Sequence, residues 1–201
     1  MFYKQVVSAV AIALTLIAYL PYMRDIVQGK TKPHVFSWVT WGATTFVVFL
    51  AQLDAKGGVG AWPVGVSGSI TILVAALAYV KRADVGITKL DWLFFLAAMS
   101  SLPLWYFTSD PLWAVVVLTI VDLLGFGPTL RKAFVHPHSE SIPFFAMFAV
   151  RNVLVVAALE SYSLATVLFP AAVAVACCLL ILLIAYRRKE ITKTSIPQTN
   201  A

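Results

Sequence analysis

Seven stretches of mostly apolar residues follow one another along the chain, separated by short polar connections. Each is close to the length of about 20 residues that an α-helix needs to cross the hydrocarbon core of a bilayer. The stretches cover residues 5–27, 35–53, 62–80, 90–108, 112–132, 142–160 and 163–186. This pattern predicts an all-α membrane protein with seven transmembrane helices, and it leaves almost no chain for a soluble domain.

The composition leads to the same class of protein. The 201 residues are 61% hydrophobic and only 12% charged, and the mean hydropathy is +0.88. A soluble domain of this size cannot bury so much apolar surface, so we expect the lipid bilayer to be the partner of the outer helix faces. The first stretch begins after Lys4 and lacks a small-residue cleavage site, so we predict a retained helix rather than a signal peptide.

The positions of the basic residues along the chain account for the net charge of +6, so the charge does not indicate a nucleic-acid partner. If the seven helices alternate in direction, only Lys4 and Lys56 fall on one side of the membrane. The other side receives twelve: Arg24, Lys30, Lys32, Lys81, Arg82, Lys89, Arg131, Lys132, Arg187, Arg188, Lys189 and Lys193. By the positive-inside rule this asymmetry predicts a cell-membrane protein with its N-terminus outside and its C-terminus in the cytoplasm.

The chain carries a weak internal repeat. Shifting the sequence by 107 residues pairs Pro21 with Pro128 and Pro63 with Pro170, and it keeps helix boundaries and basic clusters in phase. Two units of three helices can lie parallel only if another helix separates them. We therefore predict a three-helix repeat at 1–86, a linking helix at 87–109, a second repeat at 110–190 and a cytoplasmic tail at 191–201.

Two segments at corresponding places resemble the paired motifs of the SWEET and PQ-loop superfamily. The first is Tyr-Leu-Pro-Tyr-Met-Arg at 19–24, continued by Gly-Lys-Thr-Lys-Pro at 29–33 and Ser-Trp at 37–38. The second is Gly-Pro-Thr-Leu-Arg-Lys at 127–132, continued by Ser-Glu-Ser at 139–141. The resemblance implies a small-molecule carrier with a three-plus-one-plus-three plan, in which each repeat packs its helices in the order 1, 3, 2.

Pro21 and Pro128 occupy the same depth in the two repeats. A proline inside a helix frees the carbonyl four residues earlier and bends the axis. The pair is predicted to act as matched hinges for opening and closing the cytoplasmic side. The alternative is that both are packing features, since proline is frequent in membrane helices.

A candidate solute-binding face lies on the second stretch. Trp38, Trp41 and Thr45 share one helical face, and Asn152 on the sixth stretch is the repeat partner of Thr45. Indole rings and hydrogen-bonding groups suit a sugar or another hydroxylated or aromatic solute. In the alternative interpretation Trp38 is an interface anchor and Thr45 bonds its own backbone.

Asp122 and Arg151 are the only charged residues well inside the apolar stretches. Each lies roughly 15 Å deep, at about 1.5 Å per residue, and a charge there costs about 2.5 to 3.5 kcal/mol on insertion scales. We expect them to be partners. One hypothesis is an ion pair that fixes helix 5 against helix 6. In the other they line the solute path, where Arg151 holds an anionic or hydroxylated solute and Asp122 accepts a proton.

The sequence offers no catalytic triad, phosphate-binding loop or convincing metal-ligand set, so we expect neither an enzyme nor a cofactor. The favoured function is transport of a small solute by alternating access between the two repeats. The alternative is a non-transporting seven-helix receptor or membrane assembly factor on the same scaffold. Homo-oligomer formation stays open.

Overall fold

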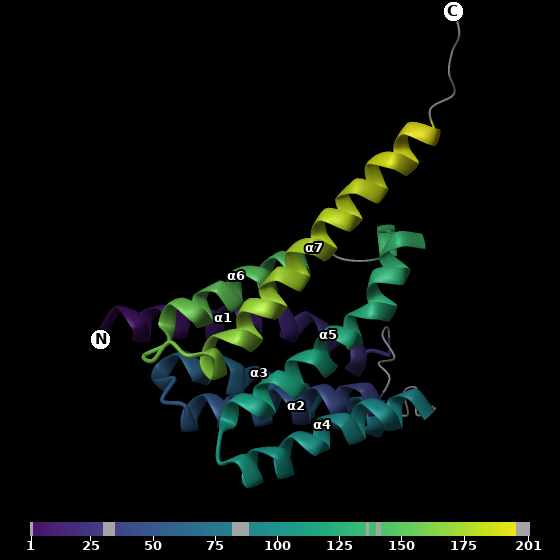
Figure 1. Ribbon diagram of the computed structural model, residues 1–201. Helices are drawn as coiled ribbons and strands as arrows, with labels where there is room; N and C mark the ends of the chain where they lie inside the picture. The colour runs from purple at the N-terminus through teal and green to yellow at the C-terminus, as the bar shows by residue number, and fades with distance from the viewer. Residues whose placement is uncertain (1, 30–34, 82–88, 136, 140–141, 196–201) are drawn as a thin grey trace, which may run out of the picture.

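The computed structural model describes residues 2–29, 35–81, 89–135, 137–139 and 142–195, which are helical apart from short turns (Figure 1). They form seven α-helices and two short 3-10 helices. In chain order these are α1 (Phe2–Val27), α2 (Val35–Asp54), η1 (Gly58–Ala61), α3 (Trp62–Val80), α4 (Lys89–Thr108), α5 (Pro111–Val135), η2 (Pro137–Ser139), α6 (Ile142–Ala158) and α7 (Leu164–Ser195). Each of the seven apolar stretches is thus an α-helix. The first part of the predicted tail, up to Ser195, continues α7, which reaches beyond the other helices in Figure 1.

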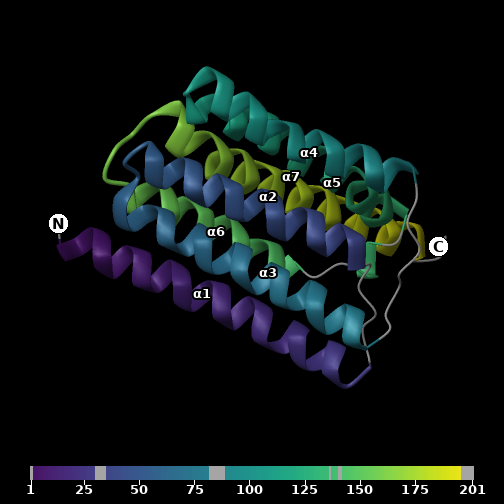
Figure 2. The same cartoon turned by 90° about the horizontal axis from the view of Figure 1, so that it is seen from below.

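The α-helices pack side by side in one bundle with α4 at one edge (Figure 2). We call α1 to α3 the first unit and α5 to α7 the second unit. In the first unit, α3 lies between α1 and α2, and in the second unit α7 lies between α5 and α6. The resemblance implies the same helix order within each repeat, and the relationship itself stays a prediction. The two units meet where α1 packs on α6 and α2 packs on α5, while α4 packs mainly on α5.

The two ends of the bundle differ in character. At one end, here called the η1 end, η1 packs against α1 and α6. At the other, here called the basic end, α1, α3 and α5 finish and α2, α4 and α6 begin. Arg24, Lys81 and Lys89 lie at these helix termini. The charge asymmetry of the sequence therefore becomes an asymmetry between the ends of the bundle.

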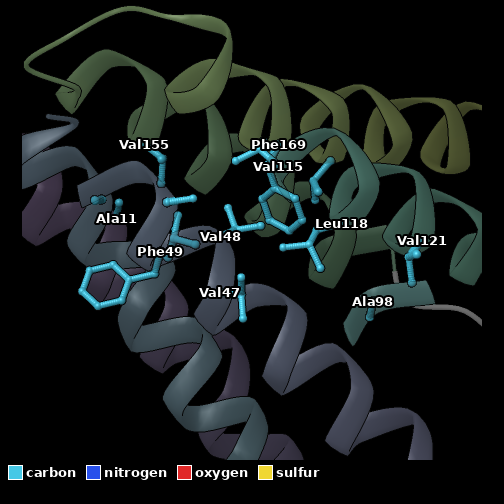
Figure 3. Packing of buried hydrophobic residues seen from close by; sticks show 14 of the residues in the cluster. Ala11, Val47, Val48, Phe49, Ala98, Val115, Leu118, Val121, Val155 and Phe169 are labelled. Atoms are coloured by element: carbon cyan, nitrogen blue, oxygen red, sulfur yellow. The ribbon is translucent and has the colours of Figure 1, made fainter. Parts of the chain in front are cut away.

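Apolar side chains fill the space between the units toward the η1 end (Figure 3). Val48 of α2 belongs to the same buried cluster as Leu118 of α5, Val155 of α6 and Phe169 of α7. Val48, Leu118 and Val155 are completely buried. Because this half of the interface is packed solid, the units are held together there.

The outer surface of the bundle is apolar. Within the described ranges, three helices are long and apolar enough to cross a membrane, at Phe2–Val27, Gly58–Val80 and Leu164–Ile191, and shorter apolar helices occur at Pro111–Phe126 and Ile142–Ala158. Large hydrophobic side chains such as Ile17 and Leu182 are more than half exposed. Helices of this kind with apolar side chains turned outward indicate a helical membrane protein.

Candidate functional site

A cavity of about 310 Å³ lies between the two units. All six helices of the units line it, and among the described residues α4 contributes none of the lining. Its lining on α1 begins at Tyr19 and on α2 ends at Thr45, so the cavity occupies the middle of the bundle and the half nearer the basic end. The volume is at the lower limit of small-molecule sites, about 300 to 1,000 Å³, and it restricts any occupant to a small solute.

The structure brings all six predicted solute-binding residues to this cavity. They are Trp38, Trp41, Thr45, Asp122, Arg151 and Asn152. They come from α2, α5 and α6, and the packing of α2 on α5 and of α6 on α1 brings these helices around one space. That these side chains bind a solute stays a prediction.

Aromatic rings form a continuous wall toward the basic end. Tyr22 stacks on Trp38 with ring centroids 5.1 Å apart, and the edge of Trp38 meets Trp41 at 5.8 Å. Tyr19 joins this group to α6, because its ring contacts Phe148 at 5.6 Å. Such edge-to-face and stacked pairs fix the ring orientations, so the wall is preformed.

Sequence reasoning did not place Tyr19, Tyr22 or the phenylalanines of α5 and α6 in the site. The repeat shift of 107 residues contains a signal for some of them. It relates Tyr19 to Phe126, Trp38 to Phe145, Trp41 to Phe148 and Thr45 to Asn152, and all eight line the cavity. Phe145 and Phe148 could therefore have been added to the predicted site as the repeat partners of Trp38 and Trp41.

Arg151 connects the second unit to the first. Its Nε donates to Thr15 Oγ1 of α1 at 3.2 Å, and its Nη2 donates to the carbonyl oxygen of Pro63 at the start of α3 at 2.5 Å. Its Nη1 donates to Asn152 Oδ1 at 2.9 Å, while Asn152 Nδ2 donates to the carbonyl oxygen of Phe148. The Arg151 residue is 4% exposed, and its three acceptors are neutral.

The predicted pairing of Asp122 with Arg151 is wrong. Among the described residues, Asp122 forms neither a hydrogen bond nor an ion pair, and Arg151 binds the neutral acceptors instead. The reason is the helix order, because α7 separates α5 from α6. The Arg151 side chain on α6 instead bonds across the units to Thr15 of α1 and Pro63 of α3. The hypothesis of an ion pair that fixes helix 5 against helix 6 is therefore wrong. Both charges nevertheless line the cavity.

Hydrogen bonds between the units close the η1 end. Ser8 Oγ donates to the carbonyl oxygen of Val59 within the first unit at 2.7 Å, which holds η1 on α1. Between the units, Lys4 Nζ donates to the carbonyl oxygen of Leu159, and the Glu160 amide donates to the carbonyl oxygen of Gly57 at 3.0 Å. The cavity is thus shut off from this end.

Gly60 allows the closest approach between the units. A Cβ atom at residue 60 would lie 2.5 Å from the amide nitrogen of Leu159, nearer than real Cβ contacts come. A side chain of any size would push η1 away from the end of α6. The fit between the units at this end therefore depends on a glycine.

The two predicted hinge prolines are both inside helices. Pro21 is exposed in α1, and Pro128 lies within the range of α5; its side chain is outside the described residues. Their role as hinges stays a prediction. No group of three or more histidine, cysteine, aspartate or glutamate side chains in the described parts of the chain could hold a metal ion.

Comparisons with protein families, with curated proteins and with solved structures find no match to this chain.

Proposed function

We propose that the chain is a small-solute transporter or facilitator in which two parallel three-helix repeats, joined by α4, move against each other by alternating access. The observation that carries the proposal is the cavity between the units, lined by repeat-related residues such as Trp41 with Phe148 and Thr45 with Asn152. A site at the interface of two structural repeats can be exposed to either side by a movement of one repeat.

The distribution of contacts supports one state of such a cycle. The interface is packed and hydrogen-bonded at the η1 end, and the cavity lies toward the basic end. By the positive-inside rule the basic end faces the cytoplasm. In the proposed cycle this arrangement is the state closed to the outside. A reporter fused to the C-terminus that is active only in the cytoplasm should give signal, and signal from an external reporter alone would contradict this orientation.

One feature favours a second candidate function. A pocket that lies toward one end and is closed at the other also fits a seven-helix receptor or assembly factor, which binds its ligand from one side without transporting it. The two candidates differ in a simple respect. A transporter must open the η1 end, and a receptor has no need to.

The proposal is tested by uptake into vesicles. A thermal-shift screen of small polar solutes on purified protein selects a ligand, and its radiolabelled form is then followed into proteoliposomes. Thr45→Trp places an indole in the cavity and should abolish uptake. Val39→Trp adds the same bulk on the exposed face of α2 and should leave uptake intact. A folded Thr45→Trp protein that transports like the parent would refute the proposal.

A further inference from the structure

The cavity is lined by one carboxyl group and one guanidinium group that do not pair with each other. Asp122 is its only acidic lining residue and Arg151 its only basic one among the described residues. They project from α5 and α6, on either side of α7, and the lining residue Cys177 belongs to the helix between them. An isolated charge in the membrane interior is costly, so each of these groups favours a ligand atom of opposite charge.

The carboxylate of Asp122 is ready to accept a cation. The side chain is partly exposed, and within the described part of the chain it has no hydrogen-bond or ion-pair partner. Trp41 lies close by, because a Cβ at Gly125 would be 3.0 Å from the indole Nε1 and Gly125 follows Asp122 by about one helical turn. A carboxylate beside an aromatic ring is an environment that stabilises a cationic nitrogen.

The guanidinium of Arg151 retains capacity for an anion. Arginine has five N–H donors, and the hydrogen bonds to Thr15, Pro63 and Asn152 use three of them. The acceptors hold the group in place without neutralising it. Two donors on a fixed planar group match the two oxygens of a carboxylate.

We propose that the solute is a small zwitterion, with its cationic nitrogen at Asp122, its carboxylate at Arg151 and an apolar or aromatic side chain against the aromatic wall. A solute with a single charge would leave the opposite wall charge unmatched, and a neutral sugar would leave both unmatched. A zwitterion matches both and adds no net charge to the membrane interior. The inference rests on the proposed function for its claim that this ligand is transported, whereas binding can be measured independently.

Binding to the purified full-length protein in nanodiscs, measured by calorimetry, tests this directly. Phenylalanine is compared with phenethylamine, which lacks its carboxylate, with 3-phenylpropionate, which lacks its amine, and with glucose. A second series uses leucine, isopentylamine and 4-methylpentanoate in the same way. We expect at least one zwitterion to bind ten times or more tightly than both of its single-charge analogues.

Two variants locate the cationic nitrogen. Asp122→Asn keeps the shape of the side chain and breaks no bond of the described structure, so the protein should stay folded. It should weaken the zwitterion and the amine tenfold or more and leave the carboxylate analogue unchanged. Asp54→Asn, exposed at the end of α2 and outside the cavity, is the matched control and should bind all ligands like the parent.

Several results would overturn the inference. They are binding of glucose in preference to every zwitterion, equal binding of a zwitterion and its single-charge analogues, binding of none of these probes, or full zwitterion affinity in Asp122→Asn. Uptake experiments distinguish a failure of the zwitterion inference from a failure of the proposed transport function. A zwitterion that binds but does not enter proteoliposomes refutes transport and leaves the zwitterion inference standing. Uptake of glucose without binding of any zwitterion supports transport and refutes the zwitterion inference.

Discussion

The Nε2 atom of Gln52 donates a hydrogen bond to the carbonyl oxygen of Thr166 over 2.7 Å, and this bond joins α2 of the first unit to α7 of the second. Both residues are completely buried. The other amide atom, Oε1 of Gln52, is buried without a hydrogen-bond partner among the described residues. The side chain therefore links the units at the η1 end at some cost in stability, which suits a contact that the proposed transport cycle would break.

Gln52→Leu should loosen this end without unfolding the protein. The change leaves the buried carbonyl oxygen of Thr166 without this donor, which costs about 1 to 3 kcal/mol. It also removes the unpaired Oε1, whose burial has a similar cost. We expect a melting temperature close to that of the parent and faster labelling, from the η1 side, of a cysteine placed at residue 45. Gln5→Leu, on the exposed face of α1, is the control. Unchanged labelling in Gln52→Leu would show that the bond does not hold the units closed.

Gly60→Ala should act on the same closure by steric pressure. The new Cβ would crowd the Leu159 amide at 2.5 Å, and moving the units apart relieves it. Gly42→Ala is a matched control, since its Cβ would meet Ile72 Cγ1 at 2.7 Å within the first unit.

Both glycine variants should lose about 1 to 3 kcal/mol of stability, as overpacked interiors do. Only Gly60→Ala should increase labelling of residue 45 from the η1 side. Equal labelling in the two variants would mean that η1 is not part of a gate.

Arg151→Lys tests the contact that ties α6 to α1 and α3. An ammonium group is compact and cannot reach Thr15 Oγ1, Asn152 Oδ1 and the Pro63 carbonyl together. Loss of one or two charge-assisted hydrogen bonds, at about 1.5 to 3 kcal/mol each, should lower the melting temperature by several degrees. Arg187→Lys, at an exposed hydrogen bond to Phe134, should change it little. A parent-like melting temperature for Arg151→Lys would contradict the structural part of its role.

The helices could be predicted well from the sequence because long apolar segments bounded by polar residues stand out in the hydropathy pattern. The predicted stretches differ from the observed helices by a few residues, except at the end of α7. There the helix continues to Ser195 through Arg187, Arg188 and Lys189. Polar residues are no obstacle to a helix in water, so hydropathy marks the end of the apolar segment and not the end of the helix.

The candidate site was predictable in part. Spacing along α2 and the repeat shift identified Trp38, Trp41, Thr45 and Asn152, because both depend only on local geometry. The partner of Arg151 was not predictable in this way. Equal depth on consecutive helices favoured Asp122, but α7 lies between those helices, and neighbours in space are set by the packing order. The closure by η1 was missed because it rests on backbone groups and on the absence of a side chain at Gly60.

If Pro21 and Pro128 act as hinges, replacing either by alanine should slow the exchange between the open states of the proposed cycle. Pro21→Ala and Pro128→Ala each allow the backbone hydrogen bond that the proline prevents, to the carbonyl of Ile17 or Leu124, and they straighten the helix. The proteins should remain folded while the turnover of solute in proteoliposomes falls. Normal transport by both variants would show that the prolines are only packing features.

Access to the cavity from the two sides of the membrane tests the central claim most directly, and it can be measured before any solute is identified. The measurement places a single cysteine at residue 45, with Cys177 and Cys178 replaced by alanine, and follows its reaction with a membrane-impermeant thiol reagent in vesicles of known orientation. Alternating access predicts labelling from the basic side, slower labelling from the η1 side, and an increase in the latter in Gln52→Leu and Gly60→Ala. Labelling from the basic side alone, in the parent and in both variants, would contradict a transporter and support a receptor.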